Sequence, residues 1–252
     1  MFGIEVWQVA LAFAVTGAAG FVKGAVGFAK PMIMMSAFGS FLTGEQALAL
    51  LILPTVVTNV AQALRWGAAE AWGSVRKYRL HIAMLVIFIP VSAHFVRAIP
   101  QGFMYGLLGL PIFAFALAQL TGRNLAIRIE HRRRAEAGLG IIGGLYGGIS
   151  GIWGPPLLVL LLSTGAGKSE TVRVQGVVFL IGAVILLGAH LTSGVLNAQT
   201  LPLSALMVVP AAFGMWLGLR LHDRLDPLRF RRWTLILLAL TGLNLIRRAS
   251  GL

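Results

Sequence analysis

Long apolar segments separated by short basic gaps dominate the chain. The uncharged segments run over 6–22, 31–44, 46–64, 80–96, 98–122, 137–167, 174–219 and 233–246. A helix rises about 1.5 Å per residue and the hydrocarbon core of a bilayer is about 30 Å thick, so about 20 residues span it. The pattern therefore predicts an all-α polytopic membrane protein.

Two longer stretches, 6–42, which joins the first two segments, and 137–164, share an interior pattern of glycine and proline. A shift of 124 positions brings Gly20, Gly24, Gly27 and Pro31 onto Gly144, Gly148, Gly151 and Pro155. Four coincident helix breakers indicate an internal duplication.

The duplication divides the chain into two repeats joined by a basic linker, 123–136. The first repeat, 1–122, is expected to hold segments 6–42, 45–65, 80–97 and 102–121. The second repeat, 137–252, is expected to hold segments 137–164, 172–191, 201–220 and 229–248.

Glycine in such a cluster has two interpretations. Small residues let neighbouring helices approach closely, whereas a broken helix places unwound backbone along a cavity. Pro31 and Pro155 favour the broken helix, because a helix tends to end before proline and can restart with proline in its first turn. We therefore expect breaks over 20–31 and 144–155, either re-entrant or crossing twice.

The distribution of charge sets the expected topology. The basic gaps are 65–79, 123–134, 168–173 and 220–232. Basic loops of membrane proteins face the cytoplasm, and all four gaps reach that side if each broken segment returns or crosses twice. Each repeat then has an odd number of net crossings, so the two repeats are inverted, an architecture typical of secondary transporters.

Composition excludes several other classes of protein. Hydrophobic residues make up 58% of the chain and charged residues 12%, which is too apolar for a soluble domain of this size. The net charge of +13 is explained by the topology, so nucleic-acid binding is not expected. The chain has no cysteine, which excludes disulfides and thiolate chemistry.

The two halves, their glycine-rich first segments and the Gly144–Pro156 stretch resemble the sulfite exporter TauE/SafE family, also called the toluenesulfonate uptake permeases. The resemblance covers the whole chain. It implies an inner-membrane permease of bacteria or archaea for sulfur-containing or organic anions such as sulfite, sulfonates and sulfoacetate. This sequence departs from the expected glycine and apolar pattern at Lys23 and Lys30.

Lys23 and Lys30 are the leading candidates for binding an anion. An ionisable residue at membrane depth is costly and usually functional. Snorkelling to a headgroup is the alternative, but it suits the end of a segment better than its middle. We expect the two breaks to hold the anion near the midplane of the bilayer, and the remaining wall residues are Gly24, Gly27, Pro31, Gly148, Ser150, Gly151, Trp153 and Pro155.

Three further polar residues, Asn59, Gln62 and Gln175, lie within apolar segments. Such side chains usually join helices in a membrane. They are second-tier candidates for contact with the substrate.

Ser150 also raises an enzymatic alternative. It stands in a Gly-x-Ser-Gly sequence, Gly148–Gly151, with His190 downstream, as in an intramembrane serine hydrolase. The duplicated counterpart of Ser150 is Val26, which favours a structural origin for the motif. We therefore do not expect an enzyme.

The sequence thus predicts a secondary-active transporter that moves a small anion by alternating access. The alternatives are a non-transporting membrane assembly subunit and the hydrolase. No cofactor, metal or nucleic acid is expected. The energy source is left between a proton and a sodium gradient, and a homo-oligomer is compatible with the sequence.

Overall fold

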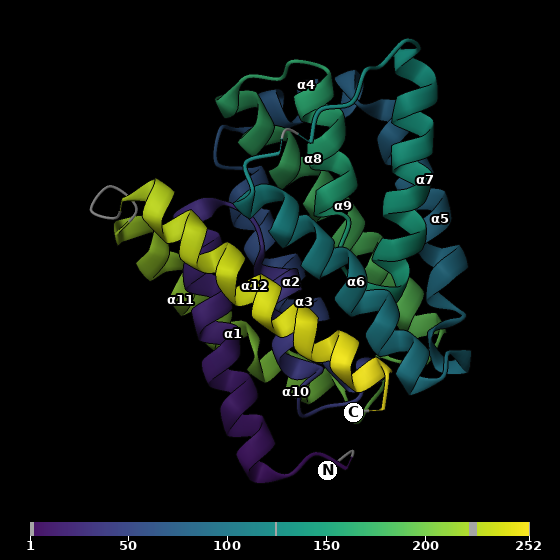
Figure 1. Ribbon diagram of the computed structural model, residues 1–252, viewed down its shortest axis with the longest axis vertical. Helices are drawn as coiled ribbons and strands as arrows, with labels where there is room; N and C mark the ends of the chain where they lie inside the picture. Colours follow the sequence, from purple (N-terminus) through teal and green to yellow (C-terminus); the bar gives the residue numbers. More distant parts are fainter. Residues whose placement is uncertain (1–2, 124, 222–225, 252) are drawn as a thin grey trace. The chain divides into compact units, whose positions relative to one another are not determined.

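The computed structural model describes residues 3–123, 125–221 and 226–251, and it contains no strand in those ranges (Figure 1). The helices of the first half are α1 (Val6–Val26), α2 (Lys30–Phe38), α3 (Gly44–Ala63), α4 (Ala68–Lys77), α5 (Arg79–Ala93), the 3-10 turn η1 (Val96–Ala98) and α6 (Gln101–Leu120). Those of the second half are α7 (Arg132–Ser150), α8 (Gly154–Ser163), α9 (Lys168–Thr192), α10 (Leu201–Leu206), α11 (Val208–Leu221) and α12 (Pro227–Ala249).

Six helical stretches in the described part of the chain are long and apolar enough to cross a membrane. They are Val6–Val26, Gly44–Ala63, Arg79–Ala98, Gln101–Leu120, Ser169–Thr192 and Leu201–Leu221. The all-α polytopic fold class predicted from the sequence is therefore confirmed.

The helices form two compact units, and neither unit is a sequence half. Unit 1 holds α1, α2, the first part of α3, α6, α10, α11 and α12, whereas unit 2 holds the second part of α3, α4, α5, α7, α8 and α9. The change within α3 falls between Pro54 and Thr55. Each unit thus draws helices from both halves of the chain.

In unit 1, glycines bring α1 against α11. A Cβ atom added at Gly20 would lie 2.4 Å from the carbonyl oxygen of Ala211, and one added at Gly24 would lie 2.2 Å from that of Met215. On the α11 side, a Cβ atom added at Gly214 would lie 2.0 Å from the carbonyl oxygen of Gly17. Such close backbone contact needs residues without side chains.

In unit 2, the equivalent glycines bring α7 against α5. A Cβ atom at Gly144 would lie 2.7 Å from Cβ of Phe88, and one at Gly148 would lie 2.3 Å from the carbonyl oxygen of Ile89. The repeated glycines therefore allow close helix packing in both units, each time against a helix from the other half of the chain.

The expected breaks are present but much shorter than predicted. The α1 helix continues to Val26 and α2 starts at Lys30, so the first break is 27–29 rather than 20–31. The α7 helix continues to Ser150 and α8 starts at Gly154, so the second is 151–153 rather than 144–155. Gly20, Gly24, Gly144 and Gly148 lie inside helices and allow close helix packing. Close packing therefore explains these four glycines, and a helix break explains Gly27 and Gly151.

Two polar stretches between the apolar segments contain helix. The basic gap 65–79 contains α4, an amphipathic helix whose last turn carries Arg76 and Lys77. Within the basic linker 123–136, α7 begins at Arg132. These polar helix turns are not marked by the apolar pattern.

Candidate functional site

The first break, in unit 1, is built from two residues with left-handed backbone. Gly27 has φ 87° and its N–H donates to the carbonyl oxygen of Lys23 over 2.7 Å, which ends α1. Ala29 has φ 74° and precedes α2, with Pro31 in the first turn of that helix. Ala29 is the single non-glycine residue with positive φ in the described ranges, and such strain is concentrated at functional sites.

Lys23 and Lys30 flank this break and are both buried, with 3% and 0% of their surfaces exposed. Lys23 lies in the last turn of α1 and Lys30 in the first turn of α2. Only the three residues 27–29 separate the two helix ends that carry these lysines. Burial of two like charges is costly, so the site favours a negatively charged ligand.

The surroundings of the first break are otherwise apolar. Almost all of α2 is buried, and α2 packs against α6 and α12 of unit 1. Phe28, at the centre of the break, meets Phe115 of α6 edge to face, with ring centroids 6.5 Å apart. Ala29 and Lys30 are buried by this packing, whereas Gly27 and Phe28 are partly exposed.

The second break, in unit 2, uses the same backbone with different side chains. Gly151 has φ 70° and its N–H donates to the carbonyl oxygen of Gly147 over 2.7 Å. Ser150 bridges the break, because its Oγ donates to the carbonyl of Tyr146 at 2.6 Å and accepts from the N–H of Ile152 at 3.0 Å. Pro155 lies in the first turn of α8, as Pro31 does in α2.

The Trp153 indole fills the space beside the second break. A Cβ atom added at either Gly147 or Gly182 would lie 2.8 Å from the ring, which packs edge to face on Phe179. Its Nε1–H is buried and has no hydrogen-bond partner among the described residues.

The two breaks therefore differ at the positions that repeat along the chain. Lys23 corresponds to Gly147 and Lys30 to Gly154 under the shift of 124 positions. Where unit 1 carries two ammonium groups, unit 2 carries two glycines covered by aromatic rings, Trp153 over the first and Phe179 near the second. The two breaks thus share a backbone conformation and differ in their side chains.

The second-tier polar candidates lie in unit 2, on the facing helices α3 and α9. Asn59 donates from Nδ2 to the carbonyl of Phe179 over 2.9 Å. Gln62 packs on Gly176, whose added Cβ would lie 3.0 Å from its Cγ, and Gln175 is buried on α9. Asn59 thus holds the backbone of Phe179, whose ring packs on Trp153.

The contacts of Ser150 and His190 give both residues a structural role. His190 engages the carbonyl of Gly148 through Nε2 at 2.9 Å and the hydroxyl of Ser193 through Nδ1 at 3.0 Å. Ser150 donates to Tyr146, as described above. A serine hydrolase requires a nucleophile bonded to its base, whereas here each side chain secures the end of α7.

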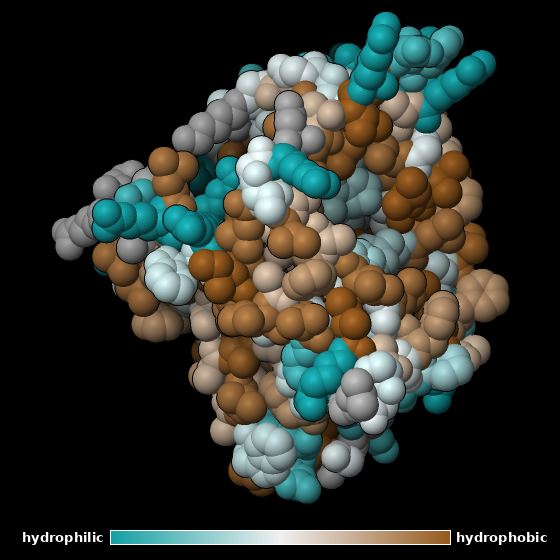
Figure 2. All heavy atoms as spheres, viewed as in Figure 1, coloured by the Kyte–Doolittle hydropathy of each residue, from teal (hydrophilic) through white to brown (hydrophobic). Residues whose placement is uncertain are grey.

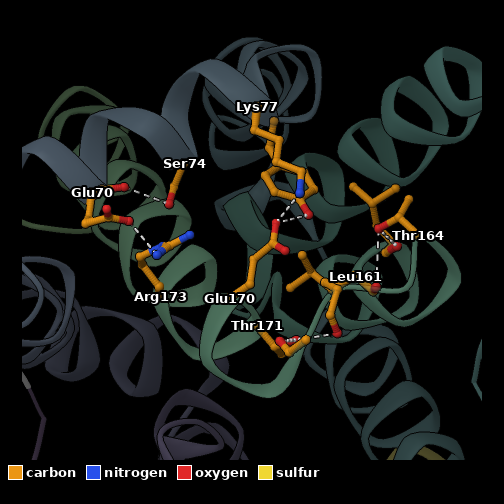
Figure 3. Close-up of polar contacts among 12 residues, drawn as sticks. Glu70, Ser74, Lys77, Leu161, Thr164, Glu170, Thr171 and Arg173 are labelled. Carbon is orange, nitrogen blue, oxygen red and sulfur yellow. Dashed lines mark hydrogen bonds and ion pairs between the residues drawn. The ribbon is translucent and has the colours of Figure 1, made fainter.

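Sequence reasoning missed a polar network at one end of unit 2 (Figure 3). Glu170 of α9 pairs with Lys77 and accepts a 3.0 Å hydrogen bond from the Tyr78 hydroxyl, and Glu70 of α4 pairs with Arg173. Burial and the contact with Glu170 raise the pKa of Tyr78 to about 12. The available signal was that the otherwise basic gaps 65–79 and 168–173 each contain one acidic residue, Glu70 and Glu170.

Comparison with known proteins agrees with this architecture. The family model described as sulfite exporter TauE/SafE matches residues 12–245, nearly the whole chain. No curated protein and no solved structure matches. With its membrane-crossing helices, the protein is a multi-pass membrane protein of the permease type, and the chain belongs to the sulfite exporter TauE/SafE family.

Proposed function

We propose that this protein is a secondary-active transporter that moves a small sulfur-containing or organic anion of the sulfite, sulfonate or sulfoacetate class. It works by alternating access in the inner membrane of a bacterium or archaeon, with its basic loops in the cytoplasm. The observation that carries the proposal is the pair of buried lysines, Lys23 and Lys30, at the break of α1 and α2.

The chemistry of the first break suits an oxyanion. Lysine ammonium groups are compact point charges with three donors each. The first turn of α2 adds the partial positive charge of a helix N-terminus directly beside Lys30. An anion in contact with both ammonium groups offsets the cost of burying them, so binding and folding favour the same occupied state.

The strained backbone of the break supports a transport cycle. Gly27 and Ala29 hold two left-handed conformations within three residues, and in this proposal a change of φ at these positions turns α2 relative to α1. Coupling to a proton or sodium gradient supplies the energy in this proposal. Inverted repeats, which the equivalent packing of α1 and α7 supports, relate the two states.

Transport of radiolabelled sulfite into proteoliposomes tests the function. We expect uptake by the wild-type protein, and a loss of at least about tenfold in Lys23→Gln and in Lys30→Gln, since each removes a charge-assisted contact. Arg220→Gln and Arg229→Gln are matched controls, because both arginines are exposed. They should transport like the wild type.

Two results would overturn parts of this proposal separately. Absence of wild-type transport across a panel of sulfite, sulfonates and carboxylates would contradict the function. Normal transport by both lysine variants would leave the function standing and contradict the site.

A further inference from the structure

A basic pocket lies in unit 1 between the end of α6 and the beginning of α12. Its volume is about 390 Å³, and its lining includes three arginines and three leucines: Arg123, Arg231, Arg232, Leu120, Leu228 and Leu235. The pocket is remote in sequence from both helix breaks. Nothing in the transport proposal requires it.

The arginines give the pocket a strong preference for anions. No carboxylate is among its lining residues in the described part of the chain. Arg231 donates from Nη2 to Oε1 of Gln119, at 2.6 Å, so one guanidinium is held in place by α6. Topology alone explains why arginines are frequent in this region, but it does not require three of them to converge on one pocket.

The leucines give the same pocket an apolar side at the membrane surface. Leu120 is the last residue of α6, a membrane-crossing helix, and Leu228 is 77% exposed in the first turn of α12. Trp233, in the second turn of α12, is 69% exposed, as expected for a residue at the interface of a bilayer. Hydrophilic side chains gather at both ends of α12, and the surface along its middle is apolar (Figure 2).

We propose that this pocket binds an anionic phospholipid, with the headgroup phosphate on Arg123, Arg231 and Arg232 and an acyl chain along the leucines. Guanidinium groups form paired hydrogen bonds with phosphate oxygens. Basic pockets between the ends of membrane helices are suited to such headgroups. The lipid would join α6 to α12 at this end of unit 1.

Native mass spectrometry of the full-length protein in neutral detergent tests the proposal, with phosphatidylglycerol titrated against phosphatidylcholine. We expect preferential retention of phosphatidylglycerol, and about fivefold weaker retention in Arg231→Gln and in Arg232→Gln. Gln119→Ala should give a smaller loss, since it frees Arg231 without removing its charge. Arg247→Gln, an exposed arginine at the other end of α12, is the matched control and should retain the lipid.

The competing explanations give different results. Equal retention of the two lipids, or an equal loss in Arg247→Gln, would show nonspecific attraction and overturn the proposal. Displacement of phosphatidylglycerol by inorganic phosphate at equal concentration would show a site for a free anion rather than a lipid. Displacement by sulfite would place the pocket on the transport path. Either displacement would overturn the assignment to lipid.

Discussion

Ala29 adopts a backbone conformation that disfavours its own side chain. Left-handed backbone costs an L-residue about 1–2 kcal/mol, whereas glycine adopts it without that penalty. Gly27, two residues earlier, is also left-handed, so the break contains one residue suited to its conformation and one that is not. Strain of this kind persists when the surrounding packing fixes it, and here α2 is almost entirely buried.

The two positions should therefore respond in opposite directions. We expect Gly27→Ala to lower the free energy of unfolding by about 1 kcal/mol, because alanine is strained at φ 87°. Ala29→Gly should raise it by up to about 1 kcal/mol, because the strain is relieved. Thermal unfolding of the purified variants measures both. A Gly27→Ala variant at least as stable as the wild type would contradict the left-handed break.

The lysines and Trp153 differ in how much of their environment the sequence could predict. Lys23 and Lys30 could be predicted as buried, because a charge within an apolar segment is exceptional. The filled space beside Trp153 could not, since it depends on Gly147 and Gly182, and the latter is remote in sequence. The role of Ser150 across the second break needed its geometry.

At the scale of helices, glycine contacts hold α1 to α11 and α7 to α5. Gly148→Ala should lower the free energy of unfolding by at least about 2 kcal/mol, because its Cβ would lie 2.1 Å from the Ser92 hydroxyl and 2.3 Å from the Ile89 carbonyl. Gly138→Ala on the same helix meets nothing within 4 Å and should be neutral or slightly stabilising. Equal stability of the two variants would refute the close α7–α5 contact.

The helices and their breaks were predictable to different extents. Both breaks could be located from the coincident pairs Gly27/Gly151 and Pro31/Pro155. Glycine is the residue that readily adopts positive φ, and proline is favoured in the first turn of a helix. Their lengths were overestimated, since glycine also marks close helix contacts. The polar α4 helix was missed because its pattern carries no long apolar run. The partners of α1 and α7 come from the opposite half of the chain, and no local pattern specifies such a pairing.

At the scale of the whole molecule, the basic loops predict the topology. A cysteine placed at Gln199, an exposed residue between α9 and α10, should react with an impermeant maleimide in intact cells. A cysteine at His131, before α7, should react only after permeabilisation. The natural chain has no cysteine, so neither variant needs a modified background. The reverse labelling pattern would contradict the cytoplasmic assignment of the basic gaps.

The central claim is that an anion binds at Lys23 and Lys30. Isothermal titration of sulfite into detergent-purified protein tests it most directly, with Lys23→Gln, Lys30→Gln and the exposed control Arg229→Gln. We expect the control to bind like the wild type and each lysine variant to bind at least about tenfold more weakly. Thermal unfolding without anion identifies the lysine variants that remain folded. Unchanged sulfite affinity in both folded lysine variants would contradict the account.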